Sequence, residues 1–231
     1  MNGINGFDDL AQGLLEKKIN KKQLLKTVKE DPALVPLLLQ GIGHKKAAVR
    51  YGCSKVLMDL SEEHPELLYS DFDFFVKLLD SKYRILVWTA FGMLANLTRV
   101  DAENRFDTIF DKYYSFLGND YMITVANLVG NSGKIANAKP YLVPKITTEL
   151  LKVQNLSTTP HLTEECKKVI SQHAISSFDL FFDKIDQQQA QVLNFVKSCQ
   201  NCSRKKLRTK AEKFLKKWDT QNQKKQKTNL F

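Results

Sequence analysis

The chain has 231 residues, of which 43% are hydrophobic, and a formal net charge of +10. This hydrophobic content is enough for a continuous core and excludes a disordered protein. Ten glycines and six prolines are fewer than a protein of many short strands and tight turns needs, so the composition favours long helices.

Neither a signal segment nor a membrane span is expected. The N-terminal residues lack both a basic start and an apolar run, unlike a secretory signal. The longest uncharged stretch, Ile85 to Thr98, has fourteen residues. A helix that crosses a bilayer needs about 20 apolar residues, so this stretch suits a buried helix. We therefore expect a cytoplasmic protein without membrane contact.

In chain order, the sequence predicts a first helix over about Phe7–Lys18 that caps the fold. After it, short apolar helices alternate with longer amphipathic ones. The segment Val153–His161, rich in Ser, Thr and Asn, is expected to be a loop between two helices. The short apolar helices are expected at Pro32–Leu39, Phe72–Leu79, Phe106–Leu117, Pro144–Leu151 and Ala190–Val196.

The longer helices share an internal repeat. Five apolar positions, at offsets 0, 4, 7, 8 and 11, define one stripe of a helix with 3.6 residues per turn. One helix pair cannot bury its apolar faces alone, so pairs spaced about 35 to 45 residues apart must stack. Three copies are clear, Val49/Cys53/Val56/Leu57/Leu60, Leu86/Ala90/Met93/Leu94/Leu97 and Leu207/Ala211/Phe214/Leu215/Trp218, and two are looser, Val125/Leu128/Val129 and Ile170/Ala174/Phe178/Phe181.

The segment FVKLLDSKYRILVWTAFGMLANL resembles a HEAT repeat, with Asp80 in the turn between its helices, and implies a solenoid of HEAT or armadillo type. Many HEAT repeats open the second helix with Val-Arg. Val49-Arg50 and Leu207-Arg208 fit this pattern, while Val87 replaces the arginine in the middle copy. The resemblance covers about residues 21–218 and implies an all-α, right-handed superhelix of about five helical pairs. We expect one domain over residues 1–218 and a basic, disordered tail over 219–231.

One candidate binding surface is an apolar row on the second helices. Trp88 lies almost opposite the apolar stripe of its helix, and Phe91 flanks it. The repeat places Tyr51 and Ile123 at the positions equivalent to Trp88. The resemblance implies that the second helices line a concave surface, where Tyr51, Trp88, Phe91 and Ile123 would bind a protein or peptide. Alternatively, these side chains simply pack together.

The second candidate surface is basic. Residues 1–196 carry no net charge, so the last 35 residues hold the whole excess of +10. Four lysines of the last helix share one flank at helical spacing: Lys206, Lys210, Lys213 and Lys217. This lysine stripe is either a solvated terminal face or a site for phosphate backbones.

No motif predicts catalysis, a metal or a cofactor. Cys199 and Cys202 lack the second pair of ligands that zinc needs, so we expect a structural or incidental pair. The alternative is an oxidisable pair on the surface. Gly130 and Gly133 have the wrong spacing for a phosphate loop, and we expect them either to permit close helix packing or to end the helix. The four histidines are dispersed.

We therefore expect a non-enzymatic scaffold that binds another protein or peptide on the concave face. The alternative is a nucleic-acid-binding protein that uses the basic C-terminal helix, together with Lys17, Lys18, Lys21 and Lys22. DNA alkylation repair glycosylases are similar in size, charge and repeat type, and they use aromatic and acidic residues on the concave face. Here Gly92 stands one turn after Trp88 instead of an acid, so their activity is not carried over.

Overall fold

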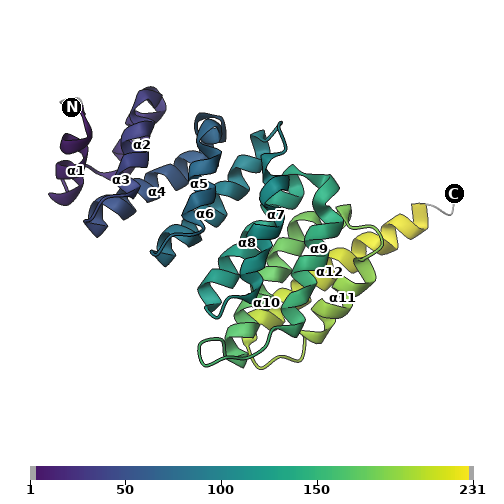
Figure 1. Ribbon diagram of the computed structural model, residues 1–231. Helices are drawn as coiled ribbons and strands as arrows, with labels where there is room; N and C mark the ends of the chain where they lie inside the picture. Colours follow the sequence, from purple (N-terminus) through teal and green to yellow (C-terminus); the bar gives the residue numbers. More distant parts are fainter. Residues whose placement is uncertain (1–3, 229–231) are drawn as a thin grey trace. The chain divides into compact units, whose positions relative to one another are not determined.

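The computed structural model describes the backbone of residues 4–228 and the side chains of residues 4–218. Twelve α-helices and seven short 3-10 helices make up this described part, which contains no strand (Figure 1). The chain divides into two compact units, Met1–Phe110 and Asp111–Phe231. A single domain over residues 1–218 stays a prediction.

The first unit contains the cap and two complete helical pairs. The predicted first helix forms but ends earlier, at Leu15, because Lys17 adopts a left-handed backbone conformation with φ 56°. A second helix precedes the first pair and was not predicted from the sequence, since only Leu24 and Val28 on it are buried. The α-helices of this unit are α1 (Phe7–Leu15), α2 (Lys21–Glu30), α3 (Val35–Ile42), α4 (Ala47–Glu63), α5 (Phe72–Leu78) and α6 (Arg84–Leu97).

The second unit contains two complete pairs and the second helix of a third. The helix α7 (Arg105–Ser115) runs across the boundary between the units. The α-helices that follow it are α8 (Met122–Ala138), α9 (Val143–Leu151), α10 (Glu164–Phe181), α11 (Gln189–Ser198) and α12 (Lys205–Thr228). The five predicted pairs are thus present as α3–α4, α5–α6, α7–α8, α9–α10 and α11–α12.

Short 3-10 helices begin or end many of the longer ones. Three of them start with a proline and lead directly into the first helix of a pair. Proline suits the first helical position because the backbone N–H that it lacks would have no helical acceptor there. The 3-10 helices are η1 (Pro32–Leu34), η2 (Pro65–Asp71), η3 (Thr98–Val100), η4 (Phe116–Gly118), η5 (Pro140–Leu142), η6 (Lys152–Asn155) and η7 (Phe182–Lys184).

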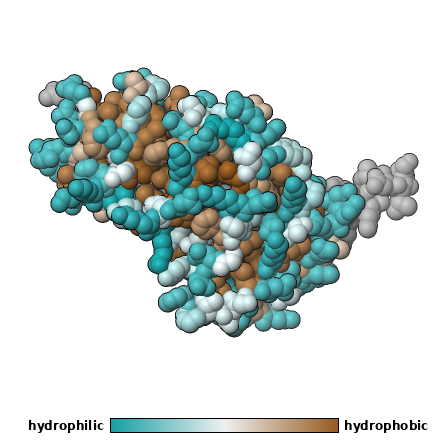
Figure 2. Space-filling model, viewed as in Figure 1, coloured by the Kyte–Doolittle hydropathy of each residue, from teal (hydrophilic) through white to brown (hydrophobic). Residues whose placement is uncertain are grey.

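The apolar stripes predicted on the second helices form the core. Every residue of the α4 stripe is 0% exposed, and the stripes of α6, α8, α10 and α12 are buried as well. The apolar residues left on the surface are few, with Ile123 at 44% and Leu180 at 50% exposed. In the space-filling view, hydrophobic residues lie in patches between hydrophilic ones on the visible face (Figure 2).

The arginines that open two of the second helices fix the turns before them. The guanidinium of Arg50 donates to the carbonyls six and five residues upstream, at 2.8 and 3.2 Å. Arg208 donates to the two equivalent carbonyls at 2.8 and 2.9 Å. The resemblance to HEAT repeats therefore extends to a shared side-chain role, which Val87 in the middle copy lacks.

The predicted role of two glycines in close packing is confirmed between α8 and α10. A Cβ added at Gly133 would lie 2.9 Å from the carbonyl oxygen of Ser177, and one at Gly130 would lie 3.1 Å from the ring of His173. The buried hydroxyl of Ser177 donates to the carbonyl of Val129 at 2.5 Å. The backbones of the two helices thus approach closely enough for a side chain of one to bond the main chain of the other.

Two predicted boundaries differ from the observed ones. The predicted loop begins as the 3-10 helix η6 and becomes irregular from Leu156. The last helix continues past residue 218 to Thr228, so the predicted start of the tail does not coincide with a helix end. Residues 229–231 of the predicted tail lie outside the described residues.

Candidate functional site

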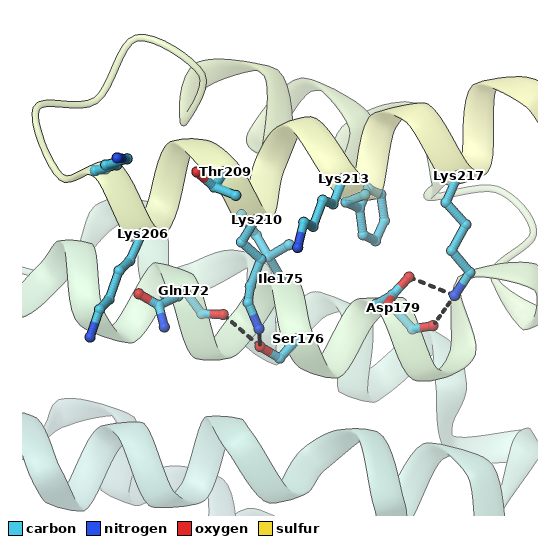
Figure 3. Close-up of a pocket in the computed structure, with 11 residues that line it drawn as sticks. Gln172, Ile175, Ser176, Asp179, Lys206, Thr209, Lys210, Lys213 and Lys217 are labelled. Carbon is cyan, nitrogen blue, oxygen red and sulfur yellow. Dashed lines mark hydrogen bonds and ion pairs between the residues drawn. The ribbon is translucent and has the colours of Figure 1, made fainter.

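The helices α10 and α12 form the two walls of an open groove of about 560 Å³, the α10/α12 groove (Figure 3). Its lining includes apolar side chains that belong to the core, Ile175 and Phe214, which are 0% and 2% exposed. Figure 3 shows the lysine side chains extending from α12 toward α10. All four residues of the predicted lysine stripe line this groove: Lys206, Lys210, Lys213 and Lys217.

The four lysines of the stripe differ in the hydrogen bonds and ion pairs that they form with α10. The ammonium of Lys210 donates to the hydroxyl of Ser176 at 2.6 Å. That of Lys217 pairs with the carboxylate of Asp179 at 2.8 Å. The exposed Lys206 and Lys213 have no hydrogen bond or ion pair to any described residue, so their charges face solvent.

Asp179 is the one carboxylate among the described residues that line the α10/α12 groove. Its Oδ1 accepts from Lys217 and also from the indole Nε1–H of Trp218, at 2.9 Å. Both partners lie at the C-terminal end of the groove, on α12. The remaining lysines in the groove are therefore not neutralised by an acidic neighbour within it.

A second groove of about 330 Å³ lies between α8 and α10, the α8/α10 groove. The half-exposed Ile123 of the predicted apolar row lines it. The side-chain amides of Asn127 and Asn131 also line it, and each donates to the carbonyl four residues earlier on α8, at 2.8 Å. One N–H of each amide is thus engaged, while the second N–H and the carbonyl oxygen keep hydrogen-bonding capacity.

Both grooves open on the same face of α10. Val169 and His173 line the α8/α10 groove, and Gln172 and Ser176 line the α10/α12 groove. Residues three and four positions apart share one side of a helix, so the grooves are neighbours across α10. Burial lowers the pKa of His173, and the nearby charge of Lys210 lowers it further. The histidine is therefore neutral at neutral pH, and the positive charge of this face resides on the lysines.

In the first unit, the predicted apolar row is only partly available. Tyr51 on α4 and Trp88 on α6 are half-buried, and the two helices pack against each other. Phe91 is 0% exposed, so its place in a binding row is corrected: its side chain belongs to the core. Ten of the fourteen residues of α6 are buried, which leaves this helix little free surface. A continuous row from Tyr51 to Ile123 would span both units and stays a prediction.

The thiols lie in structural positions. Cys53 is 0% exposed, and burial raises its pKa to about 12, so it is a small apolar core residue. Cys199 is buried with a raised pKa, again because of burial, and Cys202 is half-buried in the turn that follows. A thiol whose pKa is raised by burial is a poor nucleophile, which favours the structural interpretation of this pair.

No group of three His, Cys, Asp or Glu side chains within the described residues is placed to hold a metal ion. Within the same residues, no helix is both long and apolar enough to cross a bilayer.

The sequence did not reveal the α10 side of the site. Gln172, Ser176 and Asp179 are polar residues of an amphipathic helix, which resemble an ordinary solvated face. Their spacing at i, i+4 and i+7 was a usable signal, because it matches the spacing of the lysines on α12. Only the packing register of α10 on α12 brings the two sets together.

No protein-family model matches the chain, and no curated protein resembles it in sequence. The solved structures that share its backbone arrangement include two designed armadillo repeat proteins. The designed armadillo repeat protein YIII(Dq)4CqI matches with a TM-score of 0.58 over 93% of this chain and 95% of its own, at 15% identity. The fold is an armadillo/HEAT-type helical repeat. A second designed armadillo repeat protein, solved in complex with the peptide (KR)4, matches with a TM-score of 0.56 over 91% of this armadillo-like chain and 90% of its own, also at 15% identity.

The structure adds no support for the activity of DNA alkylation repair glycosylases in this armadillo-like chain. The helices α6 and α8, which carry Trp88 and Asn127, contain no acidic residue. Of the N-terminal lysines considered for nucleic-acid binding, Lys18 pairs with Glu16 at 2.5 Å.

Proposed function

We propose that the protein is a non-enzymatic scaffold that binds a segment of another protein along the exposed faces of α8, α10 and α12. The observation that carries the proposal is the pair of grooves that open on one face of α10. Repeat proteins of this kind stack helical pairs and use the exposed helix faces as extended binding surfaces. We call the combined lining of the α8/α10 and α10/α12 grooves the binding face.

The chemistry of the binding face suits a peptide. It combines apolar contact at Ile123 with amide acceptors at Asn127 and Asn131 and with ammonium donors on α12. A peptide main chain offers N–H groups to the amide oxygens, and its side chains can enter the grooves. A similarly folded designed protein was solved with a peptide, which supports this mode of binding for the fold. A cytoplasmic location stays an expectation from the sequence.

The proposal can be tested with a substitution that fills the α10/α12 groove and leaves every charge unchanged. Thr209 lines this groove and is exposed, so Thr209→Trp should fill the space without disturbing the core. A displayed random peptide library is first selected for binding to the whole wild-type chain. The selected peptides should bind this variant at least about tenfold more weakly, as expected when a bulky side chain occupies a pocket.

The matched control is Gln200→Trp, at an exposed turn position outside both grooves. It should bind the selected peptides like the wild type. The proposal fails if the library yields no binding peptide, or if both tryptophan variants bind the selected peptides equally well.

A further inference from the structure

The charge of the α10/α12 groove restricts which peptides it can accept. Five lysines and one carboxylate line the groove, and that carboxylate, Asp179, is already held by Lys217 and Trp218. A ligand with positive charges would meet uncompensated ammonium groups. A ligand with carboxylates would neutralise them, which favours both encounter and specificity.

Lys206 and Lys213 are the two lysines of the stripe that the described residues leave without a hydrogen bond or an ion pair. They are seven residues apart on α12, which corresponds to about 10 Å along the helix axis. Roughly three residues of an extended chain cover this distance. Two carboxylates separated by a short stretch of peptide can therefore pair with both lysines at once.

The aliphatic stems of the lysines give the groove apolar surface, beside the buried Ile175 and Phe214 of its lining. An apolar side chain of a ligand placed there would be removed from water while its acidic neighbours pair with the lysines. Such a buried anchor surrounded by polar contacts is typical of peptide-binding sites.

We infer that the natural occupant of the α10/α12 groove is an acidic peptide segment in which an apolar side chain is flanked by Asp or Glu residues. This inference rests on the proposed function and adds the chemical class of the partner. It makes the partner the opposite in charge of the (KR)4 peptide bound by the similarly folded designed protein.

A nucleic-acid backbone fits the groove less well than an acidic peptide. A phosphate backbone carries a continuous row of charges, whereas Lys206 and Lys213 are the two lysines of the stripe that the described residues leave without a partner. The only aromatic residue in the described lining, Phe214, is buried and offers no surface on which a base could stack. Binding of nucleic acid is therefore the alternative that the test must exclude.

The test measures fluorescence anisotropy of labelled probes with the whole chain. The first probe is a peptide with a central Leu flanked on both sides by Glu and Asp. Its counterparts replace the acidic residues by Gln and Asn, or by Lys and Arg. The remaining probes are duplex and single-stranded DNA and RNA.

The acidic peptide should bind at least about tenfold more tightly than the neutral one, and the basic peptide should bind most weakly. The Lys206→Glu/Lys213→Glu variant should abolish this preference, and the affinity of the acidic peptide for the wild type should fall as salt rises. The matched control, Lys45→Glu/Lys197→Glu, changes the net charge equally at exposed residues outside the grooves and should keep the preference.

The outcomes separate this inference from the proposed function. If peptides bind and Thr209→Trp weakens them, but acidic peptides have no advantage, the inference is wrong and the scaffold proposal stands. If no peptide is sensitive to Thr209→Trp, both fail. Binding of DNA or RNA tighter than the acidic peptide, and lost in Lys206→Glu/Lys213→Glu, would overturn the inference in favour of a phosphate backbone.

Discussion

At Gly133 of α8, the neighbouring helix α10 comes so close that a methyl group does not fit. An added Cβ would lie 2.9 Å from the carbonyl oxygen and 3.1 Å from the Cα of Ser177, and both are backbone atoms that cannot turn away. Gly133→Ala should therefore lower the free energy of unfolding by about 1–2 kcal/mol, because the cost of overpacking exceeds the gain in helix propensity. Urea denaturation measures the difference.

Gly118→Ala is the control at the residue scale. It adds the same methyl group in a 3-10 helix where no atom lies within 4 Å of the new Cβ. Its effect on the free energy of unfolding should stay below about 0.5 kcal/mol. Equal effects of the two substitutions would mean that α8 and α10 do not approach each other at Gly133 as described.

At the scale of the element, α10 carries a histidine whose protonation opposes folding. Burial and the charge of Lys210 lower the pKa of His173 below the 6.5 of an unperturbed imidazole. The unfolded chain therefore binds a proton more readily than the folded one. The stability linked to this group is fully present above about pH 6.5 and is lost as the pH falls through the folded-state value.

The expected result is a larger drop in melting temperature between about pH 7.5 and about pH 5.5 for the wild type than for His173→Gln, which does not titrate in this range. Thermal unfolding followed by circular dichroism gives both values. Equal drops in melting temperature for the two proteins would show that folding does not lower the pKa of His173.

The elements also show what the sequence could and could not predict. The apolar stripes were predictable because a period of 3.6 residues survives in a single sequence, and the buried stripe of α4 confirms it. The helix α2 was missed because it is mostly polar, with Leu24 and Val28 alone in the core. Phe91 was misplaced because α6 is buried on most sides, so the face opposite its stripe is not free surface.

The candidate functional site, too, was only partly predictable from the sequence. The four lysines of α12 were predictable as one stripe, since their spacing is a local property of the sequence. Their role in a groove was not, because it depends on the register in which Ser176 and Asp179 of α10 pack against them. Packing register between helices is a tertiary property that no local pattern encodes.

At the scale of the whole molecule, helical pairs of an armadillo/HEAT-type repeat place their second helices in a layer, and in the second unit this layer carries the binding face. We have inferred that an acidic segment occupies the α10/α12 groove of the intact chain. Chemical footprinting tests it without any substitution. Each lysine is acetylated with a limiting reagent, with and without the acidic peptide, and its rate is read by mass spectrometry.

Lys206 and Lys213 should react more slowly when the acidic peptide is bound, because their ammonium groups pair with its carboxylates. Lys45 and Lys197, exposed outside the grooves, should react at the same rate in both samples. Uniform protection of all lysines, or protection that spares Lys206 and Lys213, would contradict the assignment of the binding face.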